Sequence, residues 1–290
     1  MANSGQPIAS GVARRPLHVS QARTQLPRLR HRRGVRLLPV VYRHTAISRR
    51  DAFLASYPKS GNTWLKFMLT HLLGDREADL DNDSTVVADV GSHRSTPRVL
   101  PGGGRLIKSH EPYAAPQKRF YRKAIYLIRD GRDVAVSYYY TLIRRGLYEG
   151  DFAPFLRLFL EGGVDGYGPW HEHVESWLES PLRSDGSLLV LKYEELLADP
   201  VGGLSAAMEF LGVPVARERA EQTIEAYSAE RMRERERRTR FHERKKRQDI
   251  MFVRAARAGD WAETFAPADE ALFREVTGDL LDRLGYVSAP

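Results

Sequence analysis

The fold is decided by residues 52–73, which read Ala52-Phe-Leu-Ala-Ser-Tyr-Pro-Lys-Ser-Gly-Asn-Thr-Trp-Leu-Lys-Phe-Met-Leu-Thr-His-Leu-Leu73. A short apolar run comes first, Pro58 and Gly61 interrupt it, and a long stretch with helical apolar spacing begins at Trp64. This order predicts a buried strand, a tight loop and a helix. Backbone N–H groups and the positive end of the helix dipole converge on such a loop, which therefore favours an anion.

The same order recurs further along the chain. Residues 123–128 read as a second strand, Asp130-Gly131 as a turn, and residues 132–140 as the helix that follows. Residues 105–109 and 187–192 have the composition of two more buried strands. Strands that alternate with helices indicate an α/β fold, in which a central parallel β-sheet is flanked by helices in three layers. Later helices are expected at residues 201–211, 217–227 and 267–284.

The composition indicates one domain behind a basic tail. The chain has 290 residues, a size that can bury one sizeable core. Residues 1–50 contain eleven arginines and no acidic residue. Residues 1–48 are therefore predicted to form a basic, disordered tail, and residues 49–290 the folded domain. Contact of the tail with nucleic acid or an anionic membrane is the alternative. Cysteine is absent, which excludes disulfides, thiolate nucleophiles and cysteine-ligated metals.

A second basic segment lies between Arg231 and Arg247. It contains ten basic residues, three glutamates and almost no apolar residue. Such a run is not expected to contribute to the core. It is interpreted either as a solvated helix or mobile lid, or as part of the binding site for an anionic ligand.

We find no segment that is long and apolar enough to anchor the chain in a membrane. The longest apolar run, residues 35–41, is interrupted by Arg36 and Pro39 and is far shorter than the roughly twenty residues of a spanning helix. The Arg14-Arg15 pair lacks the apolar stretch of an export signal. The protein is therefore expected to be cytoplasmic.

The loop at residues 57–64 carries the groups that a phosphate site needs. Gly61 allows the backbone to approach a ligand closely. Lys59 supplies a positive charge, and Ser60 and Thr63 supply hydroxyl donors. The loop does not match the G-x-x-x-x-G-K-[ST] pattern of P-loop enzymes, because Lys59 precedes the glycine. A P-loop-type nucleotide kinase or phosphotransferase is thus the weaker alternative, and a nucleic-acid-binding protein a weaker one still.

Two segments together resemble the sulfotransferases that use 3′-phosphoadenosine 5′-phosphosulfate (PAPS). Residues 53–73 resemble that family's 5′-phosphosulfate-binding loop and helix, and residues 123–140 resemble its 3′-phosphate-binding element, in the same order. The similarity covers residues 50–287. It implies a cytosolic-type or bacterial small-molecule sulfotransferase with a P-loop-like, three-layer fold.

The resemblance also implies roles for individual residues. The 5′-phosphosulfate would be held by Lys59, Ser60, Gly61, Asn62, Thr63 and Trp64. Arg129 and Ser137 would bind the 3′-phosphate, a task that suits a forked guanidinium at a strand end and a hydroxyl on the next helix. Tyr193 matches a tyrosine that approaches the adenine, and Ser228 matches the serine of the family's Thr-Ser-Phe element.

The family's carboxy-terminal signature, R-K-G-x-x-G-D-W, is matched only in part. Arg254 corresponds to its arginine, whereas Ala255 and Ala256 replace the lysine and the glycine. One contact with the 3′-phosphate is therefore in question. Arg257 is the candidate to supply it instead.

Residues 108–112, Lys108-Ser-His-Glu-Pro112, resemble the family's K-[ST]-H-x-P element. The resemblance implies that His110 deprotonates the acceptor and that Lys108 helps to hold the transferring group. Sulfuryl transfer is an in-line displacement in which charge builds on the departing phosphate oxygen, by analogy with phosphoryl transfer. Lys59 is the candidate to stabilise that oxygen, because it lies on the loop that would hold the phosphate.

The expected acceptor is a hydroxyl or amine of a small molecule, because residues 168–177 resemble the small-molecule branch of the family. PAPS is the expected co-substrate and adenosine 3′,5′-bisphosphate (PAP) its product. Neither nucleic acid nor a membrane anchor is expected, and a homodimer is possible. No metal is expected, because the pair His171 and His173 has no third ligand at a useful spacing.

Overall fold

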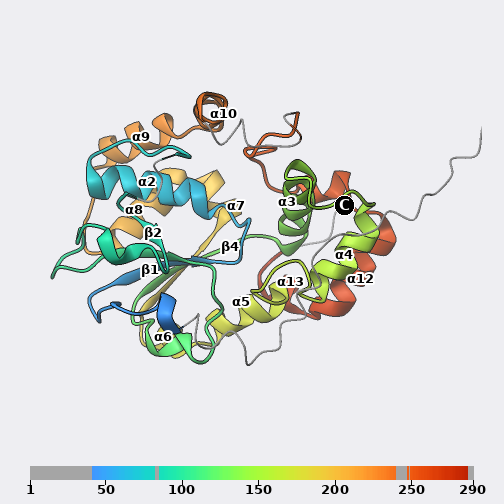
Figure 1. The fold of residues 1–290 in the computed structure, drawn as a ribbon, viewed down its shortest axis with the longest axis horizontal. Helices are drawn as coiled ribbons and strands as arrows, with labels where there is room; N and C mark the ends of the chain where they lie inside the picture. Colours follow the sequence, from blue (N-terminus) through green and yellow to red (C-terminus); the bar gives the residue numbers. More distant parts are fainter. Residues whose placement is uncertain (1–40, 82–84, 240–246, 248, 287–290) are drawn as a thin grey trace, which may run out of the picture.

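The computed structural model describes residues 41–81, 85–239, 247 and 249–286. Its five strands form one parallel sheet in the order β2-β3-β1-β4-β5 (Figure 1). The strands are β1 (Ala52–Ser56), β2 (Ala88–Asp89), β3 (Leu106–Ser109), β4 (Ala124–Ile128) and β5 (Leu188–Lys192). Helices flank the sheet, so the predicted α/β fold with a central parallel sheet is confirmed. The two-residue strand β2 was not predicted.

The central strand β1 divides the core into two halves. Its residues are all buried, and because side chains alternate along a strand, they reach opposite faces. Phe53 and Ala55 belong to one apolar cluster, whereas Ala52 and Leu54 belong to the other. This is why the strands read as continuous apolar runs rather than as alternating ones.

Each face of the sheet is covered by its own helices (Figure 1). One layer contains α2 (Asn62–Gly74), α7 (Tyr193–Ala198), α8 (Pro200–Phe210) and α9 (Arg217–Ala226). The other contains α3 (Gly131–Arg144), α4 (Phe152–Leu160), α5 (Trp170–Leu178), α6 (Pro181–Ser184), α12 (Pro267–Thr277) and α13 (Leu280–Arg283). Within the described ranges, every helix is too short or too polar to span a membrane.

The later helices agree with the predicted positions, with one exception. Helices α8 and α9 match the predictions for residues 201–211 and 217–227. The single helix predicted for residues 267–284 is instead two helices, because Gly278 ends α12 with a φ of +58°. Glycine tolerates this backbone conformation at little cost, whereas other residues do not.

The predicted tail needs a correction at its carboxy-terminal end. Residues 1–40 lie outside the described part of the chain. Residues 41–48, by contrast, pack against the domain: His44 is fully buried, and its ring contacts the rings of Phe120 and Tyr121. The boundary predicted at residue 48 is therefore too late, since the folded part already includes His44.

The basic segment between Arg231 and Arg247 begins in a helix that is more buried than expected. Residues 229–238 form α10 (Ala229–Arg238), in which Met232 and Glu236 are buried. The expectation that this run contributes nothing to the core is wrong at these two positions. Residues 240–246 lie outside the described part of the chain, and the interpretation of this segment as a lid stays a prediction.

The parallel register brings three chain segments together at one edge of the sheet. Ala55 of β1 pairs with Ser109 of β3, and Ser56 pairs with Leu127 of β4. The residues that follow these strands, the loop at 57–61, His110 and Arg129, therefore emerge side by side. Open α/β sheets bind ligands at this carboxyl edge.

Candidate active site

The loop between β1 and α2 has a backbone conformation suited to an anion. Lys59 and Gly61 have φ angles of +74° and +91°. A Cβ atom at Gly61 would lie 2.5 Å from the ring of Tyr193, so only glycine fits there. Gly61 caps α2, and among the described residues no side chain caps its first N–H groups. These groups point toward the space in front of the helix, where an anion would satisfy them.

Polar groups beneath the loop are fixed but incompletely paired. Asn62 Nδ2 donates a hydrogen bond of 2.9 Å to Ser56 Oγ. Ser60 Oγ, Asn62 Oδ1 and Arg129 Nε are buried and have no hydrogen-bond partner among the described residues. Buried polar groups are usually satisfied. Unpaired donors in Ser60 and Arg129 fit a site that receives oxygen atoms from an anionic ligand.

Lys59 has an unusual electrostatic environment. Burial lowers its pKa to about 7, and the neighbouring cations Arg144 and Arg129 act in the same direction. Its ammonium lies 4.7 Å from the ring centre of Phe252. A phosphate next to Lys59 would counter both effects, because a nearby anion favours the charged ammonium.

Arg129, at the end of β4, is held in place by three groups. Its Nη1 donates to Lys59 O at 3.4 Å, and its Nη2 contacts the carboxylate of Asp133 at 3.3 Å and Arg257 O at 3.2 Å. Its guanidinium also lies 4.4 Å from the ring centre of Tyr193. The ion pair with Asp133 orients Arg129 at the rim of the loop that contains Lys59.

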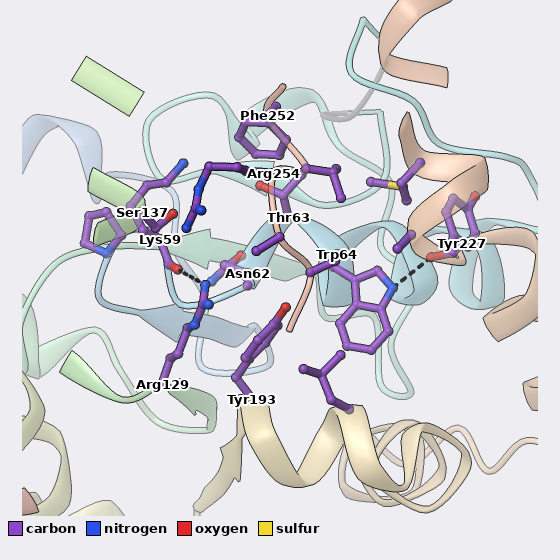
Figure 2. A pocket seen from close by; sticks show the side chains of 18 of the residues that line it. Lys59, Asn62, Thr63, Trp64, Arg129, Ser137, Tyr193, Tyr227, Phe252 and Arg254 are labelled. Atoms are coloured by element: carbon purple, nitrogen blue, oxygen red, sulfur yellow. Dashed lines mark hydrogen bonds between the residues drawn. The ribbon is translucent and has the colours of Figure 1, made fainter. Parts of the chain in front are cut away.

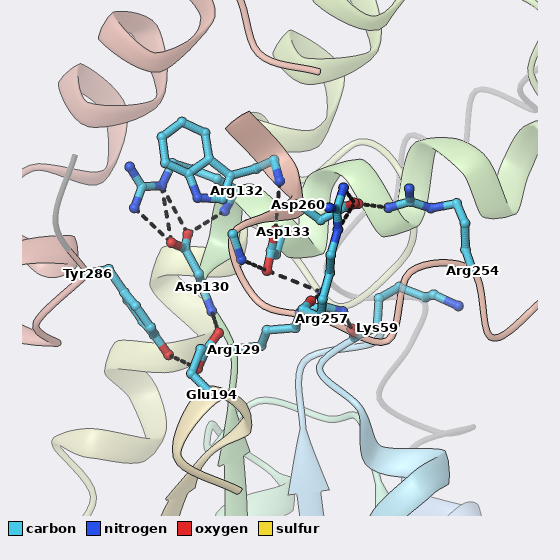
Figure 3. Close-up of polar contacts among 12 residues, drawn as sticks. Lys59, Arg129, Asp130, Arg132, Asp133, Glu194, Arg254, Arg257, Asp260 and Tyr286 are labelled. Carbon is cyan, nitrogen blue, oxygen red and sulfur yellow. Dashed lines mark hydrogen bonds and ion pairs between the residues drawn. The ribbon is translucent and has the colours of Figure 1, made fainter. Parts of the chain in front are cut away.

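The carboxy-terminal signature is hydrogen-bonded to α3, the helix that follows Arg129. Asp133 accepts hydrogen bonds from the backbone N–H groups of Gly259 and Trp261, at 3.1 and 2.9 Å (Figure 3). Arg254 forms an ion pair with Asp260 and lies 4.5 Å from the ring centre of Tyr140. Asp133 therefore connects the helix after Arg129 with the segment that carries Arg254.

The two departures from the family's signature have distinct consequences. Ala256, at the position of the glycine, has a φ of +53°, a conformation in which an L-residue other than glycine is strained. The Arg257 guanidinium forms ion pairs with Asp260 and Glu263. Arg257 does not line the cavity described below, so the structure gives no support to its suggested role at the 3′-phosphate.

A single cavity of about 320 Å³ collects most of the predicted site residues (Figure 2). Those that line it are Lys59, Gly61, Asn62, Thr63, Trp64, His110, Arg129, Ser137, Tyr193 and Arg254. They come from both strand-to-helix junctions and from the carboxy-terminal segment. Lys59 and Arg129 thus face one cavity and not two separate clefts.

One end of the cavity is aromatic and apolar. Trp64 stands edge-on to Tyr193, with ring centres 6.2 Å apart, and its Nε1 donates to Tyr227 O at 2.9 Å. This end is completed by four residues that were not expected in the site: Leu197, Tyr227, Met232 and Val253. Phe252 also lines the cavity, but its ring lies next to Lys59. Aromatic and aliphatic walls of this kind suit a planar base.

Three predicted residues do not line the cavity. The side chain of Ser60 is buried beneath the loop to which it belongs, and the residue is only 1% exposed. Ser228 caps α10, where its side chain accepts from the N–H of Arg231. Lys108 forms an ion pair of 2.7 Å with Asp89. Ser228 therefore caps a helix and does not line the cavity. Lys108 is paired with an acidic residue.

His110 has the geometry of a neutral base. Its Nδ1 lies 2.8 Å from Ser56 O, and a carbonyl can only accept, so Nδ1 carries the proton and Nε2 keeps its lone pair. Burial and, to a smaller extent, the positive charge of Lys108 lower the pKa of His110 to about 3, although the hydrogen bond to Ser56 opposes them. The imidazole is therefore neutral near pH 7.

A second histidine, His173, for which no role was predicted, is hydrogen-bonded to the backbone of His110. His173 Nε2 donates to His110 O at 3.0 Å, and its Nδ1 accepts from Tyr126 OH at 2.9 Å. The side chains of His173 and Tyr126 are both buried. His173 thus fixes the backbone of His110 from across the domain, an arrangement that only the folded chain reveals. Among the described residues, no group of three or more His, Asp or Glu side chains could hold a metal.

Comparison with known proteins gives consistent results. A family model described as the sulfotransferase domain matches residues 49–285. Mouse sulfotransferase 1B1 is 33% identical over 199 residues, or 63% of this chain and 66% of that protein. Mouse sulfotransferase 1A1 is 30% identical over 240 residues, which cover 77% of this chain and 81% of that protein.

Among solved structures, a mouse sulfotransferase complexed with PAP is similar to this chain, with a TM-score of 0.64 and 25% identity. The alignment covers 88% of this chain and 95% of that one. The match to the family model includes the strand-to-helix junctions, His110 and the carboxy-terminal segment alike. The chain belongs to the sulfotransferase family and is a PAPS-dependent transferase.

Proposed function

We propose that this protein transfers the sulfuryl group of PAPS to a hydroxyl or amine of a small-molecule acceptor, with His110 as the base. The observation that carries the proposal is the joint opening of Lys59, Arg129 and His110 onto one cavity. The nucleotide kinase considered as an alternative is not favoured by any of the similar proteins.

The cavity offers distinct sites for the parts of PAPS. The loop with Lys59 and Gly61 would bind the 5′-phosphosulfate through its N–H groups and the ammonium. Arg129, Ser137 and Arg254 would bind the 3′-phosphate. The adenine would lie between Trp64 and the apolar residues near Tyr227. This arrangement is supported by the buried, unpaired donors of Ser60 and Arg129.

Transfer would proceed by in-line displacement at sulfur. The acceptor oxygen forms a bond to sulfur while the bond between sulfur and the 5′-phosphate oxygen breaks, and the bonding electron pair leaves with the phosphate. The acceptor proton moves to His110 Nε2. Lys59 stabilises the negative charge that develops on the departing oxygen. Bound PAPS would raise the low pKa of His110, because its negative charges offset the nearby lysines.

The remaining expectations complete the proposal. A small-molecule acceptor, a cytoplasmic location, turnover without a metal, a possible homodimer and the absence of nucleic acid as a partner all stay predictions. The residue roles given above, including those of Tyr193 and Arg254, are likewise predictions.

The test combines a donor assay with an acceptor screen. Calorimetry should show tight binding of PAP and weak binding of ATP with magnesium. Incubation with ³⁵S-labelled PAPS and a panel of phenols, alcohols and amines should then label at least one acceptor. Preference for ATP with magnesium over PAP would refute the proposal, as would labelling of no acceptor by a protein that binds PAPS.

A further inference from the structure

Lys108 is engaged by an acidic residue that belongs to none of the recognised motifs. Strand β2 pairs with β3 so that Asp89 lies directly opposite Lys108. Opposed residues on neighbouring strands project from the same face of a sheet, and Asp89 Oδ1 lies 2.7 Å from Lys108 Nζ. Only 13% of the Lys108 side chain is exposed. The ion pair therefore determines where this ammonium lies.

The pair is next to the proposed base. Lys108 and His110 are two residues apart at the end of β3. The positive charge of Lys108 lowers the pKa of His110, and only the effect of burial is larger. The carboxylate of Asp89 raises the pKa of His110. His110 must become positive when it takes the acceptor proton. A carboxylate that offsets Lys108 makes this step easier.

A second lysine acts on the same carboxylate from the helix layer. Lys66, on α2, is fully buried. Burial alone would raise the pKa of Asp89, but Lys108 and, to a smaller extent, Lys66 hold it below its usual value. Asp89 is thus ionised, and the charges of two ammonium groups favour this state. Its own side chain is 46% exposed, so a substitution there leaves the core intact.

We propose that Asp89 is a positioning residue for sulfuryl transfer: it holds the Lys108 ammonium beside His110 and offsets its charge. The inference rests on the proposed function, because it assigns Lys108 to the transferring sulfuryl group. Asp89 itself touches neither co-substrate nor acceptor. Its effect on the sulfuryl group is exerted through Lys108, and this is the property that a test can isolate.

The test is a double-mutant cycle between Asp89→Asn and Lys108→Met. Calorimetry gives the affinity of each variant for PAPS and for PAP, which differ by the sulfuryl group. Wild type should bind PAPS more tightly than PAP. Each single variant should reduce this preference by about tenfold, the equivalent of one hydrogen bond to a charged group. The double variant should be no worse than Lys108→Met alone, because Asp89 has no effect without its partner.

Two controls separate positioning from a merely structural role. Asp89→Glu keeps the carboxylate and should restore most of the PAPS preference. Asp75→Asn removes an exposed carboxylate just after the end of α2 that pairs with Arg219 and should leave both affinities unchanged. All variants should retain the PAP affinity of wild type, because PAP lacks the sulfuryl group to which Lys108 is assigned.

The outcomes distinguish a failure of the proposed function from a failure of the role of Asp89. If wild type binds neither nucleotide, the proposed function fails. If wild type prefers PAPS and Asp89→Asn keeps that preference, the role of Asp89 is refuted. The same conclusion follows if the costs of the two substitutions add in the double variant, or if Asp89→Glu is as impaired as Asp89→Asn.

Discussion

Replacing Ala256 by glycine is predicted to stabilise the protein, although it removes a side-chain atom. Ala256 has a φ of +53°, and an L-residue other than glycine pays about 1 to 2 kcal/mol in this region. Glycine relieves that strain but costs about 0.5 to 1 kcal/mol through the greater freedom of the unfolded chain. The net gain should be about 0.5 to 1 kcal/mol in the free energy of unfolding.

The adjacent residue provides the matched control. Ala255 also lines the cavity, but it is not among the residues of the described chain with a positive φ. Ala255→Gly should therefore lower the free energy of unfolding by about 0.5 to 1 kcal/mol. Urea unfolding at constant m-value compares the two variants, and PAP calorimetry follows the cavity. Equal effects at the two positions, or destabilisation by Ala256→Gly, would show that residue 256 is not strained.

Three further predictions concern the site and the chain ends. His110→Ala should lower kcat by about 10²- to 10⁴-fold and change PAP affinity by less than about twofold; a largely active variant would exclude His110 as the base. Because burial lowers the pKa of Lys59 to about 7, its ammonium is lost in the free protein as the pH rises above that value. PAP affinity should therefore fall by about tenfold or more between pH 7 and about pH 9, and Lys59→Met should abolish this dependence; an unchanged slope would assign the titration elsewhere. Removal of residues 1–40 should leave activity intact, whereas removal of residues 1–46 takes away buried His44 and should cost about 1 to 3 kcal/mol of stability. Equal thermal stability of the two truncated proteins would contradict the packing of that segment.

The fold and the centre of the site were predictable because their signals are local. A strand, a glycine-containing loop and a helix follow one another directly in residues 52–73, and parallel strands place the residues after them at one edge. Arg129 and His110 each follow a buried strand, so their convergence with Lys59 needs only the order of the elements. The cavity that these residues line agrees with that expectation.

The contacts that support the site were not predictable, because they join distant parts of the chain. His173 reaches His110 across 63 positions. Buried Glu236 on α10 accepts from the N–H groups of Phe252 and Val253, which ties the basic helix to the cavity wall. Strand β2 has only two residues, too few for a periodic signal, so the pairing of Asp89 with Lys108 was invisible as well. Such pairs of residues are brought together by tertiary packing, and no regular spacing in the sequence indicates them.

The proposed binding of PAPS depends on two anion sites that bind the two ends of one nucleotide. Calorimetry with PAP and with adenosine 5′-monophosphate tests this most directly, because the nucleotides differ by the 3′-phosphate alone. Wild type should prefer PAP by about a hundredfold, the equivalent of two hydrogen bonds to a charged group. Arg129→Lys and Ser137→Ala should reduce that preference while leaving the affinity for adenosine 5′-monophosphate unchanged. A preference that survives both substitutions, or an equal loss for both nucleotides, would contradict the assignment of Arg129 and Ser137 to the 3′-phosphate.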